Sequence, residues 1–124
     1  MPFEKSQIGA RGENLAEKYL KKRGYQIIER NWQYKGRGEI DIIARDKDTL
    51  VFVEVRVRGP NSYQTPQESV TSEKLHVLKR TAQIYQKVQS KEKEPLRIDL
   101  VAVTYPNSIT SPNIKLFKNI TQGR

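Results

Sequence analysis

Carboxylates and arginines interrupt two apolar segments in the middle of this 124-residue chain. Glu39 and Asp41 stand two positions apart in the first segment, and Glu54, Arg56 and Arg58 alternate with valines in the second. Side chains two positions apart on a strand point to the same face of a sheet. A buried charge is costly unless it pairs with an opposite charge or binds a metal ion. The pattern therefore leaves two interpretations open, an arginine-paired strand and a functional site.

The acidic residues suit a hard divalent cation. Mg²⁺ and Mn²⁺ prefer carboxylate and carbonyl oxygens, so Asp41 and Glu54 predict such a site. Glu13 lies at the edge of the apolar face of a predicted helix and can complete the site, although glutamates near helix starts are commonly exposed. A cation held in this way lowers the pKa of a bound water and stabilises the charge that develops on a phosphodiester.

Lys74 is an unusual residue for its position. It falls in the first turn of a second predicted helix, close to the centre of the apolar face. Its ammonium either extends outward to solvent, as long basic side chains do, or points at the carboxylates of the sheet. The second geometry would make Lys74 a catalytic residue.

The overall charge favours a polyanionic partner. Lys and Arg total 23 against 14 Asp and Glu, and the net charge is +9. Nucleic acid is the first expectation and an anionic membrane surface the second. The chain has no cysteine and one histidine, which excludes disulfides, cysteine nucleophiles and multi-histidine metal sites. No apolar run is long enough to span a membrane and no signal-peptide segment follows Met1, so we expect a soluble, cytoplasmic protein.

Apolar periodicity predicts two helices and five strands in one domain, residues 1–124. The segment 50–57 is almost continuously apolar, as in a central strand covered on both faces. The order α-β-β-β-α-β-β indicates an α/β or α+β sheet with flanking helices. The predicted helices are residues 8–23 and 71 or 72 to about 89, and the predicted strands are residues 25–34, 40–44, 50–57, 98–104 and 114–117.

Several short motifs in fixed order resemble the bacterial YraN-like family. They are Gly9-Ala10-Arg11-Gly12-Glu13 with Ala16 and Tyr19-Leu20, Gly24-Tyr25, Arg30-Asn31, Gly38 to Ala44, Val51 to Val55, Lys74, Ala82 and Arg97 to Val101. That family is similar to the restriction-endonuclease-like PD-(D/E)xK superfamily, and within it to archaeal Holliday-junction resolvases. The resemblance implies a central mixed β-sheet flanked by helices. It also implies Mg²⁺- or Mn²⁺-dependent cleavage of DNA rather than RNA, at branched or junction structures, by a homodimer.

The resemblance assigns roles position by position. Glu13 matches the first-helix glutamate of the resolvase branch, and Asp41 matches the metal-binding aspartate. Glu54 matches the acidic member of the (D/E)xK pair, and the Val55 carbonyl is a further ligand. Glu39 belongs to the glycine-glutamate-hydrophobic-aspartate motif. The family features therefore predict Asp41, Glu54 and Glu13 as metal ligands.

Arg56 departs from the superfamily pattern, because it occupies the position of the motif lysine. An arginine can neutralise a phosphate but stays protonated and cannot act as a base. Lys74 can supply an ammonium from the helix instead. The alternatives are an inactive nucleic-acid-binding module that retains the nuclease fold, and an interaction protein whose carboxylates are satisfied by arginines.

Three further cations are predicted to bind nucleic acid. Lys35 and Arg37 lie in a turn with two glycines, next to Trp32 and Tyr34, and Arg58 follows the charged strand face. Basic residues beside aromatic residues are typical of nucleic-acid contacts. The alternative for the aromatic residues is that they belong to the core.

Overall fold

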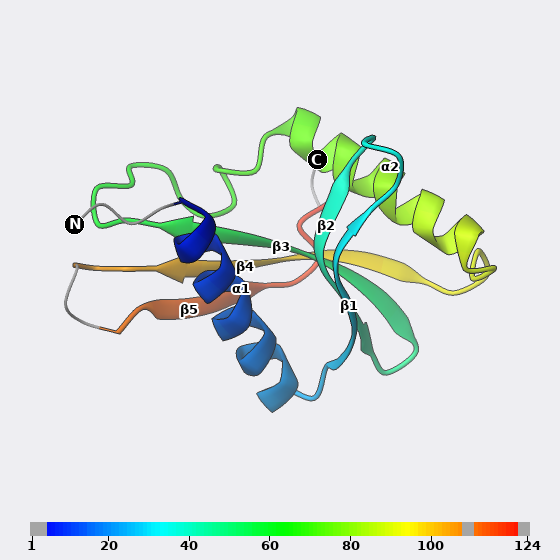
Figure 1. Ribbon diagram of the computed structural model, residues 1–124, viewed down its shortest axis with the longest axis horizontal. Coiled ribbons are helices and arrows are strands. Elements are labelled where there is room, and N and C mark those ends of the chain that lie inside the picture. The colour runs from blue at the N-terminus through cyan, green and yellow to red at the C-terminus, as the bar shows by residue number, and fades with distance from the viewer. Residues whose placement is uncertain (1–4, 108–110, 122–124) are drawn as a thin grey trace.

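The computed structural model describes residues 5–107 and 111–121, which form one α/β unit (Figure 1). The predicted element order is confirmed. No helix in these described ranges is long and apolar enough to cross a membrane. The elements are α1 (Lys5–Lys22), β1 (Gln26–Gln33), β2 (Glu39–Asp46), β3 (Thr49–Arg58), α2 (Ser72–Val88), β4 (Leu96–Thr104) and β5 (Asn113–Phe117).

The five strands form one mixed sheet in the order β1-β2-β3-β4-β5. β3 pairs with β4 in parallel, and the other three pairings are antiparallel. The parallel pair requires a crossover, which α2 provides. The expectation of a central mixed sheet flanked by helices is therefore confirmed, and segment 50–57 lies in its central strand.

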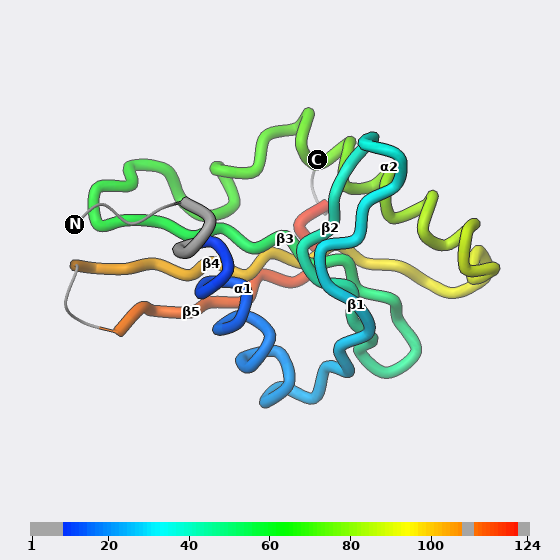
Figure 2. The backbone as a smooth tube through the Cα atoms, in the orientation of Figure 1, coloured from blue at the N-terminus to red at the C-terminus, as the bar shows by residue number. Residues whose placement is uncertain are grey.

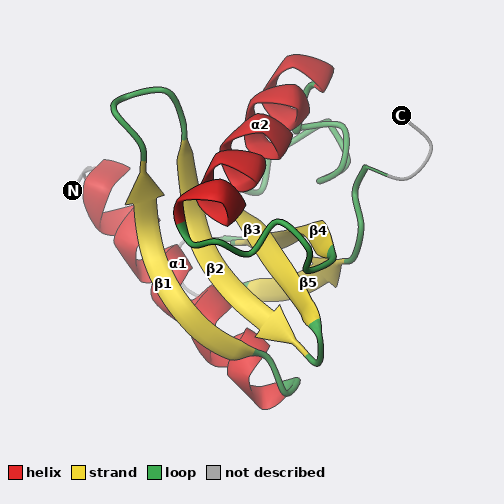
Figure 3. Cartoon of the chain, turned by 90° about the vertical axis from the view of Figure 1, so that its right-hand side faces the viewer, coloured by secondary structure: helices red, strands yellow, loops and turns green. Residues whose placement is uncertain are grey.

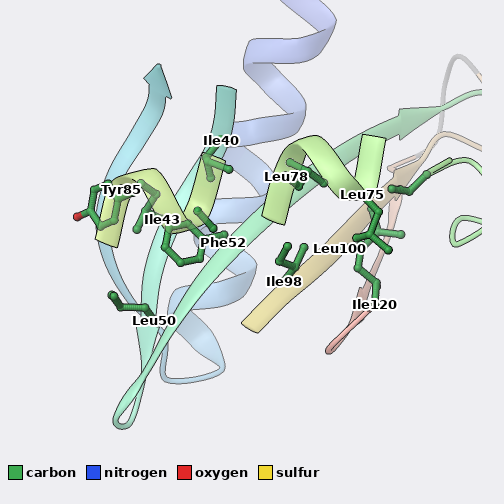
Figure 4. Close-up of a cluster of buried hydrophobic side chains, with 12 residues drawn as sticks. Ile40, Ile43, Leu50, Phe52, Leu75, Leu78, Tyr85, Ile98, Leu100 and Ile120 are labelled. Atoms are coloured by element: carbon green, nitrogen blue, oxygen red, sulfur yellow. The ribbon is translucent and has the colours of Figure 1, made fainter. Parts of the chain in front are cut away.

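The two helices cover opposite faces of the sheet (Figure 3), so there are two hydrophobic clusters. The cluster under α2 contains Ile40, Ile43, Leu50, Phe52, Val70, Leu75, Leu78, Ala82, Tyr85, Ile98, Leu100 and Ile120 (Figure 4). The cluster under α1 contains Ala16, Leu20, Tyr25, Ile42, Ala44, Val51, Val53, Val101 and Val103. Burial of both clusters fixes the helices against the strands that carry the predicted site.

Local sequence signals mark the start of α2 and the end of α1. Thr71 caps α2, because its hydroxyl accepts a 3.1 Å hydrogen bond from the Lys74 N–H. Gly24 follows α1 with a φ of 89°, a left-handed conformation that favours glycine. The chain then turns directly into β1.

The sheet opens between β2 and β3. Their pairing runs only from Asp46–Thr49 to Ile42–Val53, whereas β3 stays paired with β4 as far as Arg58. Beyond that point the β1–β2 hairpin turns away from β3 (Figure 2), and we call this opening the fork. The free end of the hairpin packs on α2 instead: Trp32 meets Tyr85 edge to face at 5.2 Å, and a Cβ at Gly38 would overlap the Thr81 hydroxyl.

Candidate active site

Asp41 and Glu54 meet at the fork. The Val55 N–H donates a 2.8 Å hydrogen bond to Oδ2 of Asp41, which holds the side chain of a β2 residue against β3. Glu54 is 5% exposed and comes within hydrogen-bonding reach of the Asp41 carboxyl. The two carboxylates that the sequence predicted as metal ligands are therefore brought together.

Burial and like charges perturb Asp41. The pKa of its carboxyl is raised to about 7, first by burial and then by the negative charge of Glu54, with a smaller contribution from Glu13. The Val55 N–H acts in the opposite direction, because it stabilises the ionised form. A strongly perturbed carboxyl next to a second carboxyl is typical of sites that bind a cation or move a proton.

Glu13 approaches this pair from α1 without joining it directly. A Cβ at Gly12 would overlap Cγ2 of Val57, so the glycine allows α1 to lie close to β3. The Glu13 carboxylate forms an ion pair with Arg30 of β1 at 3.3 Å. Arg30 also lies 3.5 Å from Glu17. Glu13 therefore adds negative potential at Asp41 while an arginine holds its own side chain.

Two carboxylates, rather than three, fit a metal ion here. In the ranges 5–107 and 111–121, no group of three or more His, Cys, Asp and Glu side chains is close enough to hold one. Asp41 and Glu54 nevertheless offer adjacent hard oxygens whose repulsion a divalent cation would relieve. The donor set fits Mg²⁺ or Mn²⁺ with water or phosphate oxygens completing the shell, and Glu13 as a third ligand stays a prediction.

Arg56 lies beside the acidic pair. Its Nε is 3.1 Å from Oε2 of Glu54, within ion-pair distance. The same Nε is buried and makes no hydrogen bond within the described residues, so its N–H is not directed at that carboxylate. A hydrogen bond from an N–H needs alignment as well as distance. The contact is electrostatic, and the donor is left for another acceptor.

Lys74 lies half-buried in the first turn of α2, on the side of the sheet that carries Glu54 and Arg56. Within residues 5–107 and 111–121, no acidic side chain lies within ion-pair distance of its ammonium. Its main-chain N–H serves the helix cap. The catalytic role of Lys74 stays a prediction.

The expectation that Glu39 and Asp41 share a regular strand face is wrong. Ile40 belongs to the core under α2 and Ile42 to the core under α1, so the alternation breaks at Asp41. Glu39 is exposed and accepts a 3.1 Å hydrogen bond from Gln33 of β1. At this break the opposite residue of β1, Asn31, has a left-handed φ of 54°, and the Asp41 side chain accepts its hydrogen bond from β3.

The predicted nucleic-acid contacts occupy two places. Lys35 and Arg37 are exposed in the β1–β2 turn, and the Lys35 ammonium lies 5.2 Å from the ring centre of Tyr34. Arg58 is half-buried at the end of β3 and donates to the main-chain oxygen of Gln64. Trp32 packs against the core, as its alternative interpretation predicted.

A second charged cluster was missed by the sequence analysis. Asp99 of β4 is fully buried, accepts a 2.8 Å hydrogen bond from the Tyr25 hydroxyl, and binds Arg97 at 2.9 Å. Arg97 also pairs with Asp46 at 2.9 Å. The alternation of Arg97 and Asp99 within an apolar strand was the available signal. Every group in this cluster is partnered, so its role is structural.

The sequence profile described as "Uncharacterised protein family UPF0102" matches residues 12–103. The chain belongs to this family. A UPF0102 protein of Clostridium botulinum (strain Loch Maree / Type A3) is 39% identical over 123 residues, which cover 98% of this chain and 99% of that protein. One from Carboxydothermus hydrogenoformans is 47% identical over 83 residues, 67% of this chain and 70% of that protein. One from Geobacter metallireducens is 37% identical over 119 residues, 96% of this chain and 95% of that protein.

The UPF0102 match confirms the family resemblance that the motifs indicated. Its range includes both carboxylates of the fork together with Glu13, Arg56 and Lys74. The relation to PD-(D/E)xK nucleases and their chemistry stays a prediction, because the names of these relatives state no activity.

Proposed function

We propose that this UPF0102 protein is a metal-dependent endonuclease that cleaves phosphodiester bonds in DNA, with branched DNA as its substrate class. The observation that carries the proposal is the juxtaposition of Asp41 and Glu54 at the fork, one fixed by the Val55 N–H and both largely removed from water. Burying two adjacent carboxylates is unfavourable without a compensating cation. Binding of a metal ion would offset the free-energy cost of burying these two carboxylates together.

A bound Mg²⁺ or Mn²⁺ would supply an activated water and charge stabilisation at the phosphate. Asp41 and Glu54 would hold the ion. Arg56, whose Nε has an unused donor, would bind a non-bridging phosphate oxygen of the scissile group. Arg56 would orient and neutralise the phosphate but cannot remove a proton. We assign the ammonium of Lys74, a half-buried residue of α2, to the same phosphate as a second cation.

The basic surface supports a nucleic acid as the substrate. A net charge of +9 attracts a phosphate backbone, and the exposed Lys35 and Arg37 extend from the hairpin that forms one side of the fork. We propose DNA rather than RNA, a homodimer and a cytoplasmic location as in the sequence-based expectations. The dimer would present two sites to the two related strands of a junction.

A second candidate function is a DNA-binding module without catalysis. The ion pair between Arg56 and Glu54 favours it, because an arginine stands where the superfamily motif has a lysine. In this module the acidic pair would be vestigial. Glu54→Gln would then leave DNA affinity unchanged or raise it, since a repelling charge is removed.

Calorimetry with Mn²⁺ and then Mg²⁺ tests the proposal, followed by cleavage assays on four-way junctions, flaps, single strands and duplex DNA. We expect the double variant Asp41→Asn/Glu54→Gln to lose metal binding and cleavage together. The matched control, Asp48→Asn/Glu92→Gln, removes two exposed carboxylates and should behave as the wild type. A wild type that binds no metal, alone or with DNA, would contradict the nuclease and leave the DNA-binding module.

A further inference from the structure

Tyr63 is the most exposed large hydrophobic side chain of the described residues, with 98% of its surface accessible. The other five tyrosines of the chain are buried or half-buried. In residues 5–107 and 111–121, no aromatic ring stacks on Tyr63 and no cation covers it. Exposing a whole aromatic ring forgoes the favourable burial that such a ring normally provides. The ring is therefore available to a partner.

Hydrogen bonds hold the loop that carries Tyr63 in a defined conformation. It follows β3, and Arg58 donates a hydrogen bond to the main-chain oxygen of Gln64, immediately after Tyr63. Further along the chain, the Thr65 N–H donates to Glu68 at 2.8 Å and the Glu68 N–H donates to the Thr65 hydroxyl at 3.2 Å. Tyr63 lies between the two residues of the Arg58–Gln64 contact, which restricts the loop and lowers the entropy lost when a ligand binds.

The loop leads directly away from the candidate site. Glu54 and Arg58 lie on the same strand, and four residues of strand span about 13 Å. Along the axis of a duplex, each strand carries one phosphate per about 3.4 Å, so this distance corresponds to about four nucleotides of duplex. A strand whose phosphate is held at the fork therefore reaches the base of the Tyr63 loop within a few nucleotides.

The surroundings of Tyr63 favour a nucleobase over an apolar protein surface. Its neighbours Asn61, Ser62, Gln64 and Thr65 are polar and exposed, whereas protein-binding anchors sit inside an apolar patch. No acidic residue occurs between Glu54 and Glu68, and this stretch contains Arg56 and Arg58. A single exposed ring in a polar loop that follows two strand arginines is an arrangement that can stack bases next to a bound phosphate backbone.

We infer that Tyr63 stacks on an unpaired base of the DNA bound at the fork, and that it selects substrates with unpaired or splayed bases. Bases inside a duplex are already stacked on their neighbours, so the ring gains a partner only where pairing is interrupted. The inference rests on the proposed function for the binding of DNA. It adds a residue that distinguishes branched or single-stranded substrates from continuous duplex.

The test compares wild type with Tyr63→Ala, Tyr63→Phe and Tyr63→Leu by fluorescence anisotropy, in EDTA to prevent metal-dependent cleavage. The DNA probes are a branched probe with two single-stranded arms and a blunt duplex of equal length. We expect Tyr63→Ala to lose about tenfold in affinity for the branched probe and to keep its duplex affinity. Its salt dependence should match the wild type, because no phosphate contact is removed. Tyr63→Phe should bind the branched probe as the wild type does.

A second readout is specific to stacking. A 2-aminopurine base in the single-stranded arm should change its fluorescence when wild type or Tyr63→Phe binds, and not when Tyr63→Ala binds at saturation. Equal affinity of wild type and Tyr63→Ala for the branched probe overturns the inference and leaves the proposed function intact. Wild-type affinity in Tyr63→Leu also overturns it, since an apolar contact would then suffice. A wild type that binds neither DNA contradicts the proposed function itself.

Discussion

The Val55 N–H donates a 2.8 Å hydrogen bond to Oδ2 of Asp41 at the point where backbone pairing between β2 and β3 has already ended. A carboxylate thus takes over a donor that the neighbouring strand leaves unpaired. The bond fixes Asp41 toward Glu54 rather than toward either core. The acidic pair therefore lies at the place where the sheet opens, and the same end of β2–β3 pairing leaves the Val55 N–H free to bind Asp41.

Neutralising Asp41 should stabilise the metal-free protein. Asp41→Asn removes a buried charge next to Glu54 and keeps an oxygen that can accept from the Val55 N–H. We expect a gain on the order of 2 kcal/mol in the free energy of unfolding at pH 8, from the energy equivalent of a pKa shift reduced for partial screening. Urea titration measures it, with Asp48→Asn as the exposed control. A loss of stability would show that the two carboxylates do not repel each other.

The stability gained by Asp41→Asn should increase as the pH rises. The folded pKa of Asp41 is about 7, above its usual value of 3.8, so the folded protein binds this proton more tightly than the unfolded chain. The wild type therefore loses stability as pH rises from about 4 to 7, and the full penalty is present above 7. Unfolding midpoints of wild type and Asp41→Asn should be closest at pH 4 and separate toward pH 8. A constant difference would contradict the shift.

Gly12 should be required for the approach of α1 to β3. Gly12→Ala places a methyl group against Cγ2 of Val57, and we expect a loss of about 1–3 kcal/mol from overpacking. Gly9→Ala, in the same helix with no atom within 4 Å, should instead gain about 1 kcal/mol from helix propensity. Val57→Ala should partly rescue Gly12→Ala in a double-mutant cycle. Additive effects would show that the two residues do not touch.

Asp99 should be essential for stability and not for DNA chemistry. Asp99→Ala leaves Arg97 and the Tyr25 hydroxyl without their buried partner, so we expect a loss of about 3–5 kcal/mol. Tyr25→Phe removes one hydrogen bond and should cost about 1 kcal/mol. Chemical denaturation measures both values, and Tyr25→Phe should keep the metal affinity of the wild type. A metal-binding defect in folded Tyr25→Phe would connect this cluster to the site.

The cations of the β1–β2 turn should contribute to the salt dependence of DNA binding. We expect Lys35→Ala and Arg37→Ala each to reduce, by about 1, the slope of the logarithm of the DNA-binding constant against the logarithm of the salt concentration. The reduction should be the same for duplex and branched DNA. Lys22→Ala and Lys93→Ala are matched controls, because both side chains are exposed and lie in other parts of the chain. Equal slopes for all four variants would show that DNA does not pass this turn.

The sequence by itself determined the elements and the two central carboxylates. Helical and strand periodicity predicted all seven elements, because burial of one face imposes a period that local sequence records. The charges of Asp41 and Glu54 stood out for the same reason, since they interrupt segments that are otherwise apolar. Their presence in the chain did not depend on knowing which strands become neighbours.

Only the tertiary structure decided how these groups meet. Strand alternation placed Asp41 with Glu39, but the fork broke the alternation and turned Asp41 toward Val55. The pairing of Glu13 with Arg30 and of Asp99 with Tyr25 joins residues 17 and 74 positions apart. Such contacts arise from how the helices and strands pack together, and a local pattern carries no record of which distant partner will satisfy a buried charge.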